Sequence, residues 1–288
     1  MPPSIGSRRS AIRSSPPSSR ATCPAPWSPH HDRHRPDELR QRPADYARHR
    51  AGFPAALFDR LEPHGVGGAG QRIVDLGTGT GTVARQLAAR GATVTAVDPD
   101  TRLMAQGEAL AAAEGVDVVW HEATAEATGL ADASVDTVSA GQCWHWFDRS
   151  AAVAEAARIL VPGGRLAIVY FDWIPLPGNA VAATERLIER HNPSWTMGGG
   201  YGMWPQWVPE VHAGGFGAIE TFSFDVRVPY SPEAWRGRIR ASAGITVLDD
   251  KAVAAFDAEL AELLARDFPG EVLELDHRVW AMVAVRQG

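Results

Sequence analysis

The chain has 288 residues, of which 45% are hydrophobic, and this is enough to bury the core of one large domain. Its formal net charge is −6, whereas a groove that follows nucleic acid needs an excess of basic groups, so a DNA or RNA partner is not expected. No apolar run approaches the roughly 20 residues that a membrane-spanning helix needs. The cysteines, Cys23 and Cys143, follow no metal-ligand spacing and cannot form a disulfide framework. We therefore expect a cytoplasmic protein without a metal or a membrane partner, and composition leaves its oligomeric state open.

Residues 1–36 differ in composition from the rest of the chain. They are rich in Arg, Ser and Pro, and their first acidic residue is Asp32. This segment holds no apolar stretch of signal-peptide length, and its prolines disfavour the amphipathic helix of a transit peptide. We expect residues 1–36 to be a disordered leader and residues 37–288 to form a single domain.

The remaining sequence alternates between helix and strand patterns. Apolar residues recur at helical spacing from 45 to 61, with an interruption at Pro54. After a glycine-rich link the pattern predicts, in chain order, a strand at 73–76, a helix at 82–90, a strand at 93–97, a helix at 101–114, strands at 116–120 and 135–139, a helix at 150–160 and a strand at 165–170. Such alternation predicts a parallel sheet with helices on both faces.

The last third of the chain is less regular. Residues 171–217 hold many Pro, Gly and Trp residues around a helix at 180–191, and we expect them to form an aromatic-rich insertion that acts as a lid. A strand at 221–228, a helix at 252–266 and a final strand within 271–285 follow. The expected fold is α/β and Rossmann-like, with a seven-stranded, mostly parallel sheet.

The strongest chemical signal is the run VDLGTGTG at 74–81. A strand that stops at glycines and opens a helix lets the backbone approach a ligand and directs free N–H groups at it. Asp75, before the first glycine, is placed to receive the ammonium of an amino-acid ligand. Asp98, which closes the second strand, is placed to accept hydrogen bonds from both hydroxyls of a ribose. The alternative is that the glycines form only a tight turn and that Asp98 caps a helix.

These motifs resemble those of the class I S-adenosylmethionine-dependent methyltransferases, in the branch of the ubiquinone/menaquinone-biosynthesis-like and trans-aconitate-methyltransferase-like enzymes. VDLGTGTG resembles the glycine motif of that family, AVDPDTRLMAQ (96–106) its ribose-acid segment and ATAEATGLADASVDTV (123–138) its third and fourth strands. The resemblance implies S-adenosyl-L-methionine as cofactor, S-adenosyl-L-homocysteine as product, and no metal. The cofactor contacts that it implies are Tyr46, Arg50, Asp75, Gly77, Thr78, Gly79, Asp98, Pro99, Met104, Ala125, Glu126, Gly141, Gln142 and His145.

Two segments carry the candidate catalytic residues. YARHRAGFP at 46–54 resembles the family segment in which a Tyr and an Arg close over the methionine end of the cofactor, although Ala51 stands where the family usually has Pro. GQCWHWFD at 141–148 resembles a Gln-x-x-His-Trp-Phe pattern of relatives. His145 can take a proton near neutral pH, so it is the candidate base, with Tyr46 as a second catalytic candidate. The alternative for His145 is a packing or cofactor-positioning role.

The substrate is predicted from aromatic and basic residues. The chain has ten tryptophans, and those after the fourth strand include Trp144 and Trp207. The predicted substrate contacts are Trp146, Trp173, Trp195, Tyr201, Trp204 and Arg238. An aromatic lid favours a flat acceptor, such as an indole-containing compound or a tryptophan-derived diketopiperazine in natural product biosynthesis. The alternative is a small carboxylic acid of the trans-aconitate type, which Arg238 and Arg240 would receive.

The alternative to substrate binding is that these residues have only structural roles. The rings would then pack the insertion onto the core, and the arginines would form a solvated face. Residues 198–200, all glycine, are either a hinge or an ordinary loop. The charges Glu185, Arg186, Glu189 and Arg190 are interpreted as helix-surface groups.

Two other function classes remain at this point. A nicotinamide-dependent oxidoreductase would carry the GxGxxG spacing, and this chain has GxGxG with Asp75 before it. A non-catalytic module that binds a cofactor or a partner is disfavoured by the intact set of Asp75, Gly77, Gly79 and Asp98.

Overall fold

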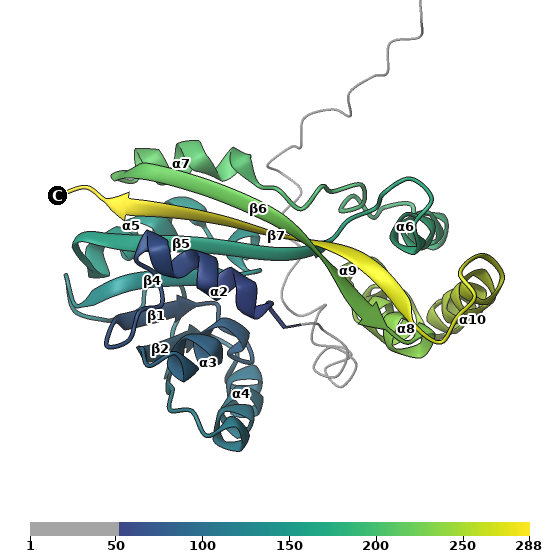
Figure 1. Cartoon of the computed structure of the whole chain (residues 1–288), viewed down its shortest axis with the longest axis horizontal. Coiled ribbons are helices and arrows are strands. Elements are labelled where there is room, and N and C mark those ends of the chain that lie inside the picture. The colour runs from purple at the N-terminus through teal and green to yellow at the C-terminus, as the bar shows by residue number, and fades with distance from the viewer. Residues whose placement is uncertain (1–51) are drawn as a thin grey trace, which may run out of the picture. The chain divides into compact units, whose positions relative to one another are not determined.

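The computed structural model describes residues 52–288, so the expected leader and the predicted contacts of Tyr46 and Arg50 lie outside the described residues. The strands are β1 (Arg72–Leu76), β2 (Thr93–Asp98), β3 (Val119–Glu122), β4 (Val135–Gly141), β5 (Leu160–Trp173), β6 (Phe216–Tyr230) and β7 (Leu273–Arg286). They form one seven-stranded sheet in the order β3-β2-β1-β4-β5-β7-β6, which Figure 1 shows. The predicted Rossmann-like α/β fold is confirmed.

Strands β1 to β5 pair in parallel, and β7 pairs antiparallel with both β5 and β6. The chain runs outward from β1 to β3 and then returns to place β4 on the other side of β1. This reversal leaves a crevice at the carboxyl ends of β1 and β4, where open α/β sheets bind ligands.

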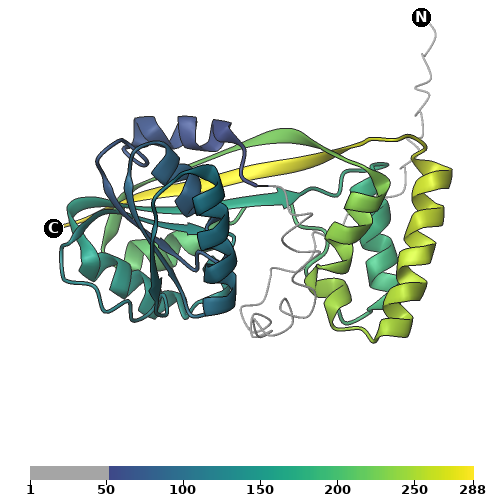
Figure 2. The same cartoon turned by 90° about the horizontal axis from the view of Figure 1, so that it is seen from below.

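Helices pack on both faces of the parallel part of this sheet, and a second group of helices lies at the far end of its last strands (Figure 2). They are α2 (Ala55–Leu61), α3 (Thr82–Ala89), α4 (Thr101–Glu114), α5 (Arg149–Ile159), α6 (Ala180–His191), α7 (Val208–Ala213), α8 (Pro232–Arg240), α9 (Ala243–Thr246) and α10 (Asp250–Asp267). Alternate residues of β5 enter two different cores: Leu166 and Ile168 join one cluster, and Ala167 and Val169 the other. Burial on both faces explains why this strand reads as a continuous apolar run.

Local capping explains why the helices begin where they do. The Asp100 side chain accepts from the backbone N–H of Arg102 at the start of α4, and Gly115, with φ of 68°, ends that helix. Asn179 caps α6 in the same manner by accepting from Ala182. The bounds predicted for these two helices, 101–114 and 180–191, agree with the structure.

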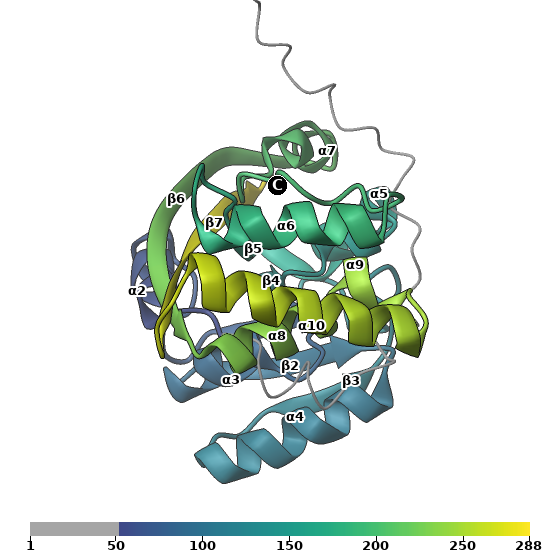
Figure 3. The same cartoon turned by 90° about the vertical axis from the view of Figure 1, so that its right-hand side faces the viewer.

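A third apolar cluster joins α6, α8, α9 and α10 to the far ends of β6 and β7. Figure 3 shows α6 and α10 side by side in this group. The last strands are longer than the predicted 165–170 and 221–228, because pairing continues to Trp173 opposite His277 and to Tyr230 opposite Leu273. No helix among residues 52–288 is long and apolar enough to cross a membrane.

Candidate functional site

The loop between β1 and α3 needs its glycines for two different reasons. A Cβ at Gly77 would lie 2.9 Å from side-chain atoms of Cys143 and Phe147, so packing excludes any larger residue there. Gly79 has φ of 56°, and a Cβ there would meet no atom within 4 Å. A tight turn accounts for the positive φ at both positions. The open space beside Gly79 additionally leaves its backbone accessible to a ligand.

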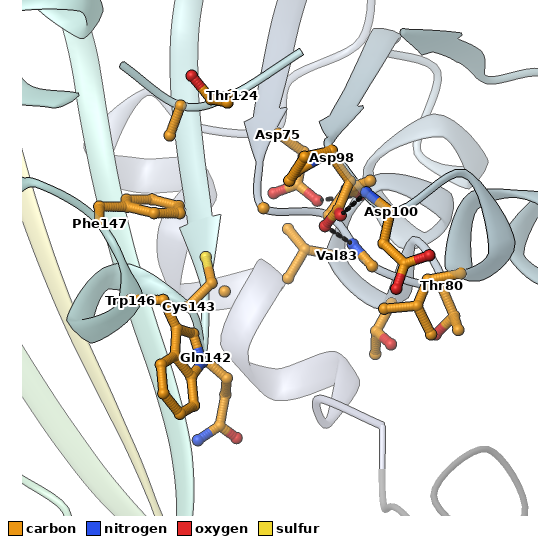
Figure 4. Close-up of a pocket in the computed structure, with 18 of the residues that line it drawn as sticks. Asp75, Thr80, Val83, Asp98, Asp100, Thr124, Gln142, Cys143, Trp146 and Phe147 are labelled. Atoms are coloured by element: carbon orange, nitrogen blue, oxygen red, sulfur yellow. Dashed lines mark hydrogen bonds between the residues drawn. The ribbon is translucent and has the colours of Figure 1, made fainter. Parts of the chain in front are cut away.

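Two carboxylates stand beside this loop at the ends of β1 and β2 (Figure 4). Asp75 is 1% exposed and accepts from the hydroxyls of Thr78, at 2.6 Å, and Ser139, at 2.7 Å. Burial raises the pKa of Asp75 to about 6, although these two hydrogen bonds act in the opposite direction. A carboxyl with this pKa is close to protonation near neutral pH, and an incoming cation would stabilise its charged form.

The second carboxylate, Asp98, braces the glycine loop. Its two oxygens accept from the backbone N–H groups of Gly79 and Asp100, both at 2.8 Å. The helix cap of α4 is Asp100, so the alternative that Asp98 serves as a helix cap is wrong. Asp98 also lines the cavity at the carboxyl ends of these strands.

A cavity of about 350 Å³ opens at the carboxyl ends of β1, β2 and β4. The predicted cofactor contacts that line it are Asp75, Gly77, Thr78, Gly79, Asp98, Pro99, Ala125, Glu126, Gly141 and Gln142. Met104 does not line it, since its side chain is buried and the neighbouring Leu103 lines the cavity instead. His145 also lies outside the lining, whereas the predicted substrate residue Trp146 belongs to it.

The sequence did not single out Phe53, Leu103, Cys143 or Phe147 as site residues, although all four line the cavity. All four lie inside the segments that resemble the family. That position was the available signal, since nothing in their residue type distinguishes them from core residues.

Gln142, which directly follows β4, has an unusual backbone conformation. Its φ is 58°, in the left-handed region that non-glycine residues seldom adopt. Its Nε2 donates to Asp172 Oδ1 at 2.7 Å, and Trp204 Nε1 donates to Asp172 Oδ2 at 3.0 Å. Asp172 therefore links the cavity wall to the segment after β5. The sequence offered one signal for it, an acid within the otherwise apolar end of this strand.

His145 lies next to the cavity, in the short helix η4 (Trp144–Trp146). Its Nδ1 is 2.6 Å from the hydroxyl oxygen of Tyr170, and its backbone N–H donates to the same oxygen at 3.2 Å. The ring also stacks against Trp204, with centroids 6.5 Å apart. These contacts fix the orientation of the imidazole, and the role of His145 as a base stays a prediction.

The tryptophans divide into core and site residues. Trp144, Trp207 and Trp235 are completely buried and pack in the cores. Trp195 packs against the helix group of α6 and α8, and Tyr201 is 62% exposed. The packing alternative thus accounts for many of these rings, and Trp146, Trp173 and Trp204 remain partly accessible.

Glu185 is not a helix-surface group. Only 6% of it is exposed, and it accepts from Trp173 Nε1 and from the backbone N–H of Gly199, each at 2.8 Å. The prediction was wrong because a neighbouring segment, invisible in the helical pattern, covers this side of α6. Burial raises the pKa of Glu185, and its contact with Gly199 ties the glycine run at 198–200 to α6.

The arginines of α8 also differ from one another. Arg236 and Arg240 both pair with Asp257 and with Glu233. Arg240 is therefore committed to internal ion pairs, and the expectation that it receives an acidic substrate is wrong. The guanidinium of Arg238 instead lies over the ring of Trp173, with Cζ 4.8 Å from the ring centroid. Among residues 52–288, no cluster of three or more His, Cys, Asp or Glu side chains is arranged to hold a metal ion.

Comparison with known proteins shows the family of this chain. The family model of the methyltransferase domain matches residues 74–168, which include both carboxylates and the glycine loop. An uncharacterized methyltransferase of Mycobacterium tuberculosis is 42% identical over 170 residues, which are 52% of this chain and 67% of that protein. The chain belongs to the class I S-adenosylmethionine-dependent methyltransferases.

Other members show the same relationship over shorter or more distant stretches. The ubiquinone/menaquinone biosynthesis C-methyltransferase of Rubrivivax gelatinosus is 44% identical over 105 residues, 36% of this chain and 41% of that enzyme. The structure of phosphoethanolamine N-methyltransferase 2 of Haemonchus contortus, in complex with S-adenosyl-L-methionine, superposes with a TM-score of 0.51 at 19% identity. That superposition covers 87% of this methyltransferase and 57% of the other chain, and it shows a shared fold.

Proposed function

We propose that this methyltransferase binds S-adenosyl-L-methionine in the cavity at β1, β2 and β4 and transfers its methyl group to a small molecule. The observation that carries the proposal is the pair of carboxylates, Asp75 and Asp98, beside the open glycine loop. Asp98 would hold the ribose hydroxyls, and Asp75 would receive the ammonium directly or through water. The open space beside Gly79 and the N-terminus of α3 would face the cofactor.

Methyl transfer depends more on the alignment of the acceptor with the methyl group than on a strong base. The methyl group moves in line from a sulfonium, which is already an excellent leaving group, and correct orientation saves roughly 7–11 kcal/mol of the barrier. A base adds about 10²–10⁴-fold only when the acceptor must lose a proton. His145 is our candidate for that step. Tyr46 and Arg50 are our candidates for covering the methionine end.

We propose that the acceptor is flat, because the partly accessible rings of Trp146 and Trp204 both lie near His145. The His145 ring centroid is 4.3 Å from that of Trp146 and 6.5 Å from that of Trp204. Two acceptor classes fit a flat space: an aromatic natural product, such as an indole, and a small conjugated carboxylic acid.

The first test is calorimetric titration of the full chain with S-adenosyl-L-homocysteine, beside Asp98→Ala. We expect binding to the wild type and a loss of affinity of at least about 100-fold in the variant, since one carboxylate makes two charge-assisted hydrogen bonds to ribose. NADH serves as the control ligand and is expected to give no heat of binding. A folded wild-type protein that ignores S-adenosyl-L-homocysteine, or that binds NADH instead, would refute the proposal.

Acid is expected to weaken the binding of S-adenosyl-L-homocysteine. The pKa of Asp75 is about 6 in the unliganded protein, so below that pH the carboxyl is neutral and cannot hold the ammonium. Affinity should fall by up to about tenfold per pH unit below this pKa. Because the pKa of Asp75 is raised from 3.8, this group makes the folded state more stable as pH falls from 6 toward 4. Its protonation therefore weakens binding without unfolding the protein.

The matched variant for this experiment is Asp75→Asn. It should bind S-adenosyl-L-homocysteine weakly, and its affinity should not change between neutral pH and pH 5, apart from effects common to both proteins. Calorimetry across that range distinguishes the two proteins. A wild type whose affinity is as flat as that of the variant would exclude Asp75 as the ammonium site.

A further inference from the structure

Three arginines follow one another at alternate positions of α8, and two of them are neutralised within the protein. Arg236 donates to both oxygens of Asp257 and to Glu233, and Arg240 donates to the same two acids. Residues two apart on a helix point to nearly opposite sides. Arg238, between them, therefore projects away from Asp257.

Arg238 forms no hydrogen bond or ion pair with any residue of the described part of the chain, 52–288, although it is largely buried. One face of its guanidinium lies on the Trp173 ring. Burial lowers its pKa, which the nearby carboxylate of Asp172 only partly offsets. An arginine keeps its positive charge in proteins, so a largely buried guanidinium without an acid is costly.

The groups around Arg238 do not supply the missing anion. The carboxylate of Asp172 already accepts from Gln142 and Trp204 and acts on Arg238 only through space. His277 is 3% exposed, and its pKa is lowered to about 4 by burial and, to a lesser extent, by the charge of Arg238. At neutral pH this imidazole is uncharged.

Arg238 does not line the cofactor cavity, but two series of neighbouring residues lead from it to the cavity wall. Trp173, on which it lies, directly follows Asp172, and Asp172 accepts from Gln142 in the cavity wall. His277, whose pKa the charge of Arg238 affects, packs against Phe171 with ring centroids 5.1 Å apart. Phe171 in turn packs against Phe53 of the same wall, with ring centroids 6.1 Å apart. Stacking on Trp173 occupies the face of the guanidinium and leaves its N–H donors, which lie in its plane, for a ligand.

We propose that Arg238, seated on Trp173, binds a carboxylate of the acceptor, so that the substrate of this methyltransferase is a flat organic acid. The inference rests on the proposed function. A planar carboxylate matches the two parallel N–H donors of a guanidinium. A neutral diketopiperazine lacks this group and is disfavoured as substrate. An aromatic acid and a small conjugated acid both carry it.

The test uses the full chain saturated with S-adenosyl-L-homocysteine and three probes: indole-3-carboxylate, trans-aconitate and the neutral indole-3-carboxamide. We expect at least one acid to bind about tenfold or more tightly than the carboxamide, because a bidentate arginine–carboxylate contact discriminates against the neutral isostere. In Arg238→Gln that preference should disappear, while the affinity for S-adenosyl-L-homocysteine stays unchanged. Arg236→Gln removes the same charge from the same helix and should keep the preference.

The inference is overturned if neither acid binds at millimolar concentration, if the carboxamide binds as tightly as the acids, or if Arg238→Gln retains the preference. Failure of the cofactor proposal gives a different result. In that case the wild type does not bind S-adenosyl-L-homocysteine, whereas the acids still distinguish wild type from Arg238→Gln when titrated into the protein alone.

Discussion

Replacing Gly79 by alanine is expected to weaken the binding of S-adenosyl-L-homocysteine about 10- to 100-fold, while the protein stays folded. Gly79 lines the cavity, and its N–H donates to Asp98. A methyl group placed there projects into the space that we assign to the ligand, and inserting a methylene into a well-packed site costs about 1–3 kcal/mol. Calorimetric titration measures this loss directly.

Gly70→Ala is the matched control for this substitution. The two glycines share a positive φ, 56° at Gly79 and 78° at Gly70, and a Cβ at either position meets no atom within 4 Å. Both variants should therefore lose about 1–2 kcal/mol of unfolding free energy from the left-handed backbone. Only Gly79 borders the cavity. Equal ligand affinity in the two variants would show that the glycine loop is a turn and not a ligand cradle.

The fold was predictable because its parallel half follows local rules. The strand and helix patterns from 73 to 170 contain residues that mark where each element begins and ends. Asp100 and Gly115, at the two ends of α4, are examples. The later strands could not be bounded from sequence. Residues 171–173 continue β5 only because β7, more than 100 positions later, pairs with them. A short stretch of sequence does not show which distant strand will pair with it.

The cofactor half of the site was predicted better than the substrate half for a related reason. Asp75, Gly79 and Asp98 belong to short motifs whose chemistry can be read from spacing. Asp172 and Glu185 take their roles from residues distant in the chain, Gln142 and Trp173 among them. A polar residue on a helix reads as exposed until its neighbours are known, which is why Glu185 was misassigned.

Replacing Glu155 by glutamine is expected to lower the unfolding free energy at neutral pH by about 3 kcal/mol. Glu155 is 8% exposed and accepts from the backbone N–H of Thr128 and from two nitrogens of Arg158, at 2.7 to 2.8 Å. These contacts, with the Arg158 hydrogen bonds as the leading cause, lower the pKa of Glu155 to about 2. The network joins α5 to the loop that carries Ala125 and Glu126 of the cavity, so the substitution should also loosen the ligand site.

The pH dependence identifies the charge of Glu155 as the cause. A carboxyl whose pKa is lowered from 4.5 to about 2 stabilises the folded state fully above pH 4.5, and this contribution is lost as pH falls through 2. In urea denaturation, wild type and Glu155→Gln should therefore differ most at neutral pH and converge in acid. Asp132→Asn is the control, because Asp132 also pairs with Arg158 but its side chain is 80% exposed. It should change stability by less than about 1 kcal/mol. A gap between wild type and Glu155→Gln that persists unchanged in acid would mean that packing, and not this charge, anchors the loop to α5.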